Sequence, residues 1–448
     1  MQCRGAPCGC PACHNYPTSA LITIAAPLPG THKGCPYNMT PLTSYPKENI
    51  RILLAENVSS TALEAFRSKG YTNITHLKGA LSEADLLAQI RDVHILGIRS
   101  KTTLTAAVIN AAEKLLAVGA FCIGTNQVAK DAAVEKGVAL FNAPYSNTRS
   151  VAELVIGAAI MLIRRIPDKN KAAHEGRWIK ESSGSHEVRG KTLGIVGYGN
   201  IGSQVSVLAE ALGLHVVYYD IEKKLPLGNA TPMPTMADVL AAADIITIHV
   251  PATKQTEKFI NATTLAHCKP GALLINYARG EVTDMHALRD ALQSGLLGGV
   301  AADVYDEEPE KNGDPFDSPL RGLSNVLLTP HIGGSTEEAQ AHIGVDVSSK
   351  LISFLENGST QGSLTVPALS LPAQEGAHRI LHIHHNQPGV LSAINGALSG
   401  HGINIVGQYL KTNDRIGYVV LDVDQALSTD AARLLREVDG TVRVRVVY

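Results

Sequence analysis

The sequence predicts an α/β protein with two Rossmann-like, doubly wound domains and a C-terminal ferredoxin-like domain of βαββαβ order. Three observations predict this fold class. A glycine-rich turn lies between an apolar strand-like segment and a helical one, and strand-like and helical segments alternate before and after this turn. The C-terminal segment has the different order βαββαβ. The chain is long enough for several domains. We expect an extension at 1–48, a discontinuous first domain at 49–146 and 334–375, a second domain at 147–333 and a third at 376–448.

The glycine-rich turn is typical of a dinucleotide-binding site. A predicted strand at 193–196 and a predicted helix at 203–212 flank a G-x-G-x-x-G pattern. The first glycine permits a tight turn, the second lets the backbone approach a pyrophosphate, and the third lets the helix pack closely on the strand. Such turns can also simply close a βα unit. The cofactor-binding residues predicted here are Gly197, Gly199, Asn200, Ile201 and Gly202.

Asp220 supports the dinucleotide interpretation. It follows the predicted strand 215–219, roughly 20 residues after the turn, where a carboxylate can accept hydrogen bonds from a ribose diol. The same carboxylate would repel a 2′-phosphate. The sequence therefore predicts NAD rather than NADP as the cofactor.

The composition argues against several classes of partner. The net charge is −2 and 45% of the residues are hydrophobic, so nothing indicates binding to nucleic acid or to a membrane. The apolar run at 20–28 is too short to cross a bilayer, and we expect a cytoplasmic protein. Residues 1–47 lack Asp and Glu, and we expect them to be disordered, with Met39 as an alternative start. A Cys8-x-Cys10-x-x-Cys13-His14 cluster lies there, but we expect no metal.

Periodicity places the elements of the two α/β domains. The helix at 151–166 is apolar on nearly every face, which favours a buried interdomain helix over a membrane span. A helix at 336–357 is long enough to return to the first domain, and 358–377 has the composition of a linker. The strands expected are 50–55, 94–98, 115–118 and 138–141 in the first domain, and 193–196, 216–219, 245–250, 272–276, 299–304 and 326–329 in the second. The first domain's helices are expected at 60–69, 83–90, 105–112 and 128–136.

The C-terminal segment has a separate pattern. Strands are expected at 379–385, 403–410, 418–423 and 441–447, with helices at 388–399, where Pro388 occupies the first turn, and at 429–438. A domain this small is expected to sense a ligand or to mediate assembly rather than to catalyse a reaction.

Three reactive side chains follow successive strands of the second domain, at the sheet edge where ligands bind. Arg279 follows the fourth predicted strand, Glu308 the fifth and His331 the sixth. His331 can accept the hydroxyl proton during hydride transfer, Glu308 can orient it, and Arg279 can hold a substrate carboxylate. Each residue alone would more often be an ordinary loop or turn residue. Their common position after a dinucleotide motif predicts the catalytic set.

A second group of polar residues follows a strand of the first domain. Arg99, Ser100 and Lys101 come directly after the strand at 94–98, and 146–149 lies at the domain crossing. Two cations at one strand end suggest that the substrate carries a second anionic group, such as a phosphate. The alternative is a solvated basic turn.

Between residues 50 and 448 the chain resembles the D-3-phosphoglycerate dehydrogenases of bacterial type, within the D-2-hydroxyacid dehydrogenase superfamily. The segments that carry the resemblance are 97–100, 122–127, 141–157, 197–202, 219–230 and 328–336. The resemblance implies NAD-dependent oxidation of 3-phospho-D-glycerate to 3-phosphohydroxypyruvate, the first step of L-serine biosynthesis. It also implies reduction of 2-oxoglutarate as a second activity, and a homotetramer. Trp178, the only tryptophan, matches a residue that packs into a neighbouring subunit of such enzymes.

Further site residues are implied by the resemblance alone. The first domain would be the substrate-binding domain, and the third an ACT domain that binds L-serine as feedback inhibitor across a subunit interface. The implied residues are His249, Pro251, Ala278, Asp303 and His331 for the cofactor; Arg99, Ser100, Asn147, Lys78 and Lys180 for the substrate; and His384, Asn386 and Asn404, with Gly389 in the turn, for L-serine.

Three positions depart from the family pattern, and two other functions remain open. Lys101 replaces an arginine, which affects the contact with the phosphate. Ala278 replaces a serine, which affects one polar contact near Arg279, and His385 replaces an acidic residue, which affects inhibitor binding. A related dehydrogenase would act on glyoxylate, lactate or 2-oxoglutarate. A nucleotide-sensing corepressor could use the same fold without a serine site. Serine-dependent kinetics would therefore distinguish a corepressor from a serine-inhibited dehydrogenase.

Overall fold

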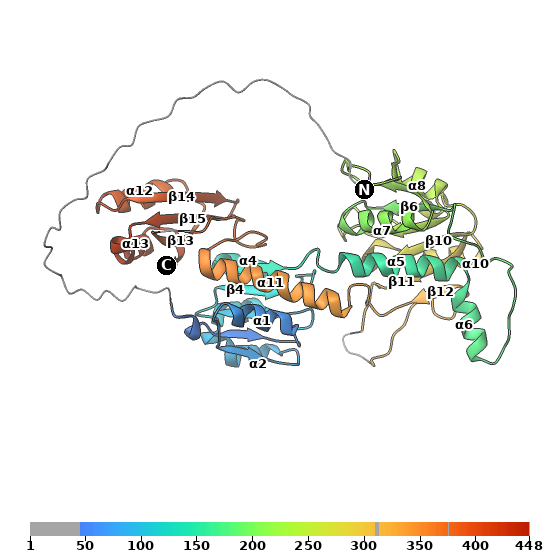
Figure 1. Cartoon of the computed structure of the whole chain (residues 1–448), viewed down its shortest axis with the longest axis horizontal. Coiled ribbons are helices and arrows are strands. Elements are labelled where there is room, and N and C mark those ends of the chain that lie inside the picture. Colours follow the sequence, from blue (N-terminus) through green and yellow to red (C-terminus); the bar gives the residue numbers. More distant parts are fainter. Residues whose placement is uncertain (1–44, 310–312, 375, 448) are drawn as a thin grey trace, which may run out of the picture. The chain divides into compact units, whose positions relative to one another are not determined.

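The computed structural model of the chain describes residues 45–309, 313–374 and 376–447. These residues form three separate β-sheets, two parallel and one antiparallel, each packed with helices (Figure 1). The predicted fold class is confirmed. Most of the predicted extension, including the cysteine and histidine cluster, lies outside the described residues.

The first sheet has five parallel strands in the order β2-β1-β3-β4-β5. Every residue of β3, β4 and β5 is buried, because helices cover both faces, and this explains why their sequences are apolar without alternation. The strands are β1 (Ile52–Leu54), β2 (Ile74–His76), β3 (Ile95–Ile98), β4 (Ala117–Ala120) and β5 (Ala139–Asn142); the helices are α1 (Ser60–Ser68), α2 (Glu83–Gln89), α3 (Ala106–Ala111) and α4 (Lys130–Glu135), with 3-10 turns η1 (Lys47–Asn49) and η2 (Ile90–Asp92).

The four-strand prediction for this domain was wrong by one strand. Strand β2 has only three residues, Ile-Thr-His, of which none is fully buried. It pairs with β1 alone at the edge of the sheet, so it carries no apolar run that a pattern could detect.

The predicted helix at 151–166 corresponds to α5 (Thr148–Ile163), and a second helix that was not predicted, α6 (Ile166–His174), follows it directly. The chain breaks at Arg165, which has a left-handed φ of 54°. Pro167 lies in the first turn of α6, where its missing N–H costs nothing, whereas inside a continuous helix it would remove a hydrogen bond. Helix α5 packs its buried residues against α7 and the second sheet.

The second sheet has seven parallel strands in the order β12-β11-β10-β9-β6-β7-β8. It adds to the six predicted strands the two-residue edge strand β8, which is exposed and begins just before a proline. The strands are β6 (Thr192–Val196), β7 (His215–Tyr219), β8 (Thr231–Pro232), β9 (Ile245–Ile248), β10 (Ala272–Asn276), β11 (Leu297–Ala302) and β12 (Val326–Leu328); the helices are α7 (Asn200–Ala211), α8 (Met236–Ala242), α9 (Ala262–Leu265) and α10 (Met285–Gln293), with the 3-10 turn η3 (Gly280–Val282).

Helix α11 (Glu337–Asn357) returns the chain to the first domain. Thr336 caps its first turn, and its buried face joins the core of the first sheet through residues that include Val347 and Leu351. The segment after it, 358–377, is the expected linker. Its described residues, which leave out 375, contain no helix or strand but pack on β5. There the Leu140 N–H donates to the Thr365 hydroxyl, and the Leu364 N–H to the Leu140 carbonyl.

The third sheet is antiparallel, in the order β14-β15-β13-β16, which is the ferredoxin-like order. Helix α12 begins at Val390, after Gly389 with a φ of 93°, so Pro388 precedes the helix instead of occupying its first turn. Its elements are β13 (His378–His385), α12 (Val390–Ser399), β14 (Ile405–Thr412), β15 (Ile416–Val423), η4 (Gln425–Leu427), α13 (Ser428–Arg436) and β16 (Thr441–Val447). Among the described residues, no helix is long and apolar enough to cross a membrane.

Candidate active site

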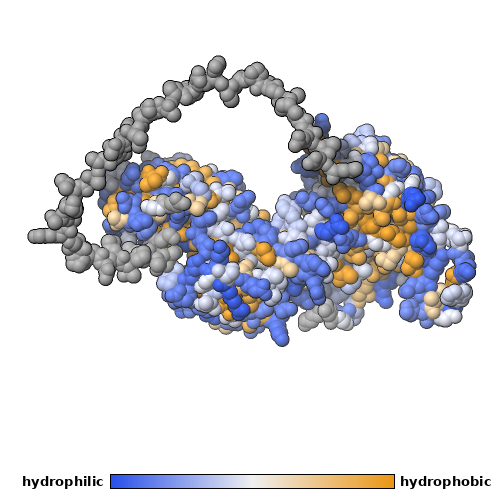
Figure 2. Space-filling model, in the orientation of Figure 1, coloured by the Kyte–Doolittle hydropathy of each residue, from blue (hydrophilic) through white to orange (hydrophobic). Residues whose placement is uncertain are grey.

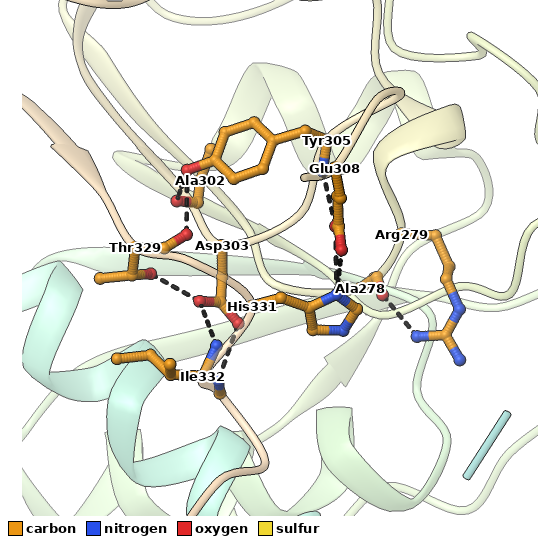
Figure 3. Close-up of polar contacts among 10 residues, drawn as sticks. Ala278, Arg279, Ala302, Asp303, Tyr305, Glu308, Thr329, His331 and Ile332 are labelled. Carbon is orange, nitrogen blue, oxygen red and sulfur yellow. Dashed lines mark hydrogen bonds and ion pairs between the residues drawn. The ribbon is translucent and has the colours of Figure 1, made fainter. Parts of the chain in front are cut away.

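The loops after β10, β11 and β12 bring the three predicted catalytic residues together (Figure 3). These strands are parallel neighbours, so their carboxyl ends meet at one edge of the sheet. The imidazole of His331 lies beside the carboxylate of Glu308, and the guanidinium of Arg279 lies near another edge of the ring.

His331 and Glu308 form the hydrogen bond that a catalytic base requires. The distances from His331 Nδ1 to Glu308 Oε2 and Oε1 are 2.8 and 3.1 Å. A carboxylate can only accept, so Nδ1 must carry the proton whenever the imidazole is neutral. This contact leaves Nε2 with its lone pair, ready to accept a proton from a substrate hydroxyl.

The two side chains shift each other's pKa. The hydrogen bond that His331 donates to Glu308 and the negative charge of Glu308 raise the pKa of His331, against the opposing effects of burial and of Arg279. For Glu308, burial is the largest influence and acts to raise the pKa, but the hydrogen bonds from His331 and from the Tyr305 N–H, with the nearby positive charges, outweigh it and lower the pKa. The pair therefore favours a charged carboxylate and a more basic imidazole.

Asp303 fixes the backbone that carries His331. The Asp303 carboxylate accepts from the Thr329 hydroxyl at 2.6 Å and from the N–H groups of Ile332 and Gly333 at 2.8 and 2.7 Å. The His331 N–H donates to the Asp303 carbonyl at 2.8 Å, and His331 itself has a left-handed φ of 53°. A buried carboxylate with three donors overcomes the strain of that conformation.

Arg279 is held by the turn that follows β10. The Asn276 amide donates to the Arg279 carbonyl at 2.9 Å and accepts from the Ala278 N–H at 3.1 Å. The guanidinium donates to the Ala278 carbonyl at 2.7 Å through Nη1. The other guanidinium nitrogens have no protein partner among the described residues, which leaves donors for a ligand carboxylate.

The glycine-rich turn has the shape that a pyrophosphate requires. A Cβ on Gly197, which has a φ of 95°, would lie 2.6 Å from the His249 carbonyl oxygen, and one on Gly202 would lie 2.2 Å from the Gly197 carbonyl oxygen. A Cβ on Gly199 would meet nothing within 4 Å. The outer glycines are thus needed by the protein, and the space over Gly199 is left for a ligand.

Helix α7 begins at this turn, so its free N–H groups favour an anion. A cavity of about 430 Å³ opens beside it. Its lining is polar and comes from both domains, from Tyr145, Ser146, Thr148, Arg149, Asn200, Ser203, Gln204 and His342. Ile201, the next residue of the turn, packs on the core of the second sheet.

The remaining predicted cofactor residues line the same strand ends. Asp220 follows β7 and accepts the Tyr198 and Glu222 N–H groups at 2.8 and 2.9 Å, one on each oxygen, so each oxygen keeps a free lone pair. His249 follows β9; burial lowers its pKa to about 3, so it stays neutral. Pro251 is exposed, and Ala278 is buried beside Arg279.

The loop with Arg99 and Ser100 depends on Glu56, a residue that the sequence interpretation missed. The Glu56 carboxylate accepts the N–H groups of Arg99, Lys101 and Thr102 at 3.0, 2.9 and 2.8 Å. Glu56 is 7% exposed and has a left-handed φ of 60°. One signal could have found it: a glutamate two residues after the buried strand β1, at the carboxyl edge of the first sheet.

The other predicted substrate residues are less closely connected. Asn147 precedes α5 and lies against the loop after His331, since a Cβ on Gly334 would be 2.0 Å from its amide nitrogen. Lys78 and Lys180 are exposed. Within the described ranges, no hydrogen bond or ion pair joins Arg99, Ser100, Lys78 or Lys180 to His331.

The structure separates the residues predicted for L-serine. His384 is 2% exposed, its Nε2 has no partner among the described residues, and it pairs with Gly417. Asn386 donates to the Asn413 carbonyl nearby at 2.7 Å. Asn404 instead precedes Ile405, which pairs with Val423. Within one chain, Asn404 therefore lies about 20 Å from His384 along β15, at ~3.4 Å per residue.

Comparison with known proteins agrees with this geometry. Residues 156–333 match the family model for the NAD-binding domain of D-isomer specific 2-hydroxyacid dehydrogenases, and residues 380–443 match an ACT domain of the AHAS small subunit type. A structure of a D-isomer specific 2-hydroxyacid dehydrogenase from Lactobacillus delbrueckii in its NAD-complexed form superposes with a TM-score of 0.62 at 25% identity, covering 70% of this chain and 99% of that one.

Two relatives match over almost their whole length. The D-3-phosphoglycerate dehydrogenase of Escherichia coli K12 is 52% identical over 407 residues, which are 90% of this chain and 99% of the relative. That of Haemophilus influenzae is 50% identical over 410 residues, 92% of this chain and all of the relative. These matches agree with the glycine-rich turn, with Asp220 and with the set of Arg279, Glu308 and His331. The cofactor is NAD, and the chain belongs to the D-3-phosphoglycerate dehydrogenase family of NAD-dependent D-2-hydroxyacid dehydrogenases.

Proposed function

We propose that the chain oxidises 3-phospho-D-glycerate to 3-phosphohydroxypyruvate with NAD, the first step of L-serine biosynthesis. The observation that carries this proposal is the contact of His331 Nδ1 with Glu308 at 2.8 Å, with Arg279 beside the same ring. It supplies a base, its orienting carboxylate and a carboxylate-binding group at one strand edge. Relatives over 90% of the chain bear the name of this enzyme.

The residues divide the reaction between them. Arg279 binds the carboxylate of the substrate with its free guanidinium nitrogens and fixes the adjacent carbon. His331 Nε2 takes the proton of the hydroxyl on that carbon, and Glu308 stabilises the imidazolium that forms. The electron pair of the C–H bond leaves as hydride while the C–O bond becomes a carbonyl. NAD supplies the hydride acceptor, held by Gly197, Gly199, Gly202 and Asp220.

The phosphate of the substrate is assigned to the first domain. Arg99 and Ser100 lie on the loop that Glu56 holds, with Lys101 next to them, and they are the cationic and hydroxyl donors at the carboxyl edge of that sheet. Asn147 contributes an amide at the domain crossing. Lys78 and Lys180 are exposed cations that we assign as secondary contacts.

L-serine is the proposed inhibitor, bound by His384 and Asn386 of one chain and Asn404 of a second. The separation of Asn404 from His384 along β15 supports a site made by two chains. A homotetramer is the proposed assembly. Apolar side chains gather on the visible surface of the second domain (Figure 2). The exposed apolar residues of this domain include Ile160, Trp178, Ile179, Val207, Leu212 and Leu225.

The test follows loss of NADH with 3-phosphohydroxypyruvate, with and without millimolar L-serine. Fast oxidation that serine suppresses is the expected result. Oxidation that ignores serine would remove the regulatory proposal alone. No oxidation would remove the catalytic proposal, and 2-oxoglutarate would then be the next substrate to assay.

A further inference from the structure

A second cavity, far in sequence from the catalytic loops, lies between the first domain and the ACT sheet. Its volume is about 750 Å³, within the roughly 300–1,000 Å³ range typical of small-molecule sites. We call it the junction cavity. It is lined by residues of the first domain, of the end of α11 and of the last elements of the chain, including Lys47, His94, Lys114, Glu356, Arg436 and Arg445.

The charges around the junction cavity do not balance. Lys47 pairs with Glu356 at 2.5 Å, and Lys114 pairs with Asp92 at 3.1 Å. The two lining arginines, Arg436 and Arg445, have no carboxylate partner among the described residues. The cavity therefore carries an excess of about two positive charges.

Arg445 lines the junction cavity, and one of its two terminal guanidinium nitrogens lacks a hydrogen-bond partner among the described residues. Its Nη2 donates to the carbonyls of Phe354 and Leu355 in the last turn of α11, and the guanidinium lies 5.1 Å from the Phe354 ring centre. Its Nη1 is buried and has no partner among the described residues. Burial lowers the pKa of Arg445 to about 10, so the group is still charged at neutral pH. A buried charged donor without an acceptor is costly, and a ligand in the cavity would reach this donor once the guanidinium turns toward it.

The rest of the wall is suited to a carbon skeleton. Ile50, Leu116, Leu355, Val444 and Val446 line it, and the Tyr45 ring lies 5.7 Å from that of His94. A monocarboxylate would leave one arginine unpaired, whereas a phosphate monoester carries up to two negative charges and accepts from guanidinium forks in pairs. Charge and shape therefore favour an organic phosphate over a simple carboxylate.

We propose that the junction cavity binds a small organic phosphate, with Arg436 and Arg445 at the phosphate and the apolar wall at the carbon skeleton. This site is separate from the catalytic loops and does not depend on the proposed reaction. Because the ligand would contact the first domain and the ACT domain together, it would strengthen their packing.

The first experiment titrates the full-length chain with inorganic phosphate at pH 7.5 and constant ionic strength, by calorimetry. Arg436→Ala should weaken one phosphate site per chain by about tenfold or more, because a charge-assisted hydrogen bond is lost. Arg433→Ala is the matched control: Arg433 lies one turn earlier on α13, is exposed, and pairs with Asp430 and Glu437 instead of lining the cavity. Equal binding by wild type, Arg436→Ala and Arg433→Ala would overturn the proposal, as would absence of binding in all three.

Two further titrations sharpen the assignment. Arg445→Lys keeps the charge but loses the fork, and should also weaken the same site; unchanged binding would remove Arg445 from the phosphate. Phenyl phosphate should bind this site more tightly than inorganic phosphate, because it can also use the apolar wall. Equal affinities would overturn the organic part of the proposal. Turnover of Arg436→Ala and Arg433→Ala separately reports the catalytic function, which should be the same in both.

Discussion

The two parallel sheets place functional loops at their carboxyl edges in different ways. In the second domain, the loops after β10 and β12 present reactive side chains directly, and Asp303 holds the backbone beneath His331. In the first domain, one buried carboxylate, Glu56, holds the whole loop that carries Arg99. In the proposed reaction, the chemistry is concentrated on one sheet and recognition of the substrate's second charge on the other. This difference predicts losses of turnover on one side and losses of affinity on the other.

The strongest test of this comparison is His331→Ala. It should lower turnover by roughly 10²–10⁴, the usual contribution of a general acid or base, while NADH still binds. Steady-state kinetics and NADH fluorescence titration measure the two effects. His267→Ala, an exposed histidine after α9, is the control. Turnover near that of the control would contradict the role of His331.

Arg279→Ala should have the next largest effect. Loss of a hydrogen-bonded charge to the substrate carboxylate costs about 1.5–3 kcal/mol, or roughly 10- to 100-fold in kcat/KM. Arg289→Ala changes a half-buried arginine of α10 that pairs with Asp290, and should leave kcat/KM unchanged. If both variants keep wild-type kcat/KM, Arg279 does not contact the substrate.

Glu308→Gln should lower turnover by about tenfold and shift the pH profile. Glu308 raises the pKa of His331, so its neutralisation lowers that pKa and leaves the imidazole unprotonated down to a lower pH. The acidic limb of kcat/KM for alcohol oxidation should therefore move to lower pH. Glu307→Gln, at the exposed neighbouring position, should keep the wild-type limb. A limb that stays in place or moves upward in Glu308→Gln would show that Glu308 does not set the basicity of His331.

Most of the second domain could be predicted from the sequence because its signals are local. A glycine pattern, an acidic residue after the next strand and apolar strand runs place Gly197, Asp220 and His331 at one edge before any packing is known. Helix α6 shows the limit, since the largely polar residues after Arg165 carry no apolar pattern from which a helix could be predicted. Asn404 shows another, because the two-chain site proposed for it would have no sequence spacing of its own.

Glu56 marks the point where sequence patterns fail in the first domain, because its function lies in contacts with residues 43 to 46 positions away. Glu56→Gln keeps the size of the side chain, but it places an amide NH₂ against one of three N–H donors. The Arg99 loop should loosen, and KM for 3-phosphohydroxypyruvate should rise by up to about tenfold, with turnover at saturation and NADH affinity nearly unchanged. Glu64→Gln, on the exposed side of α1, is the matched control. A fall in turnover without a rise in KM would place Glu56 in the chemical step, and the division of labour between the two sheets would then be wrong.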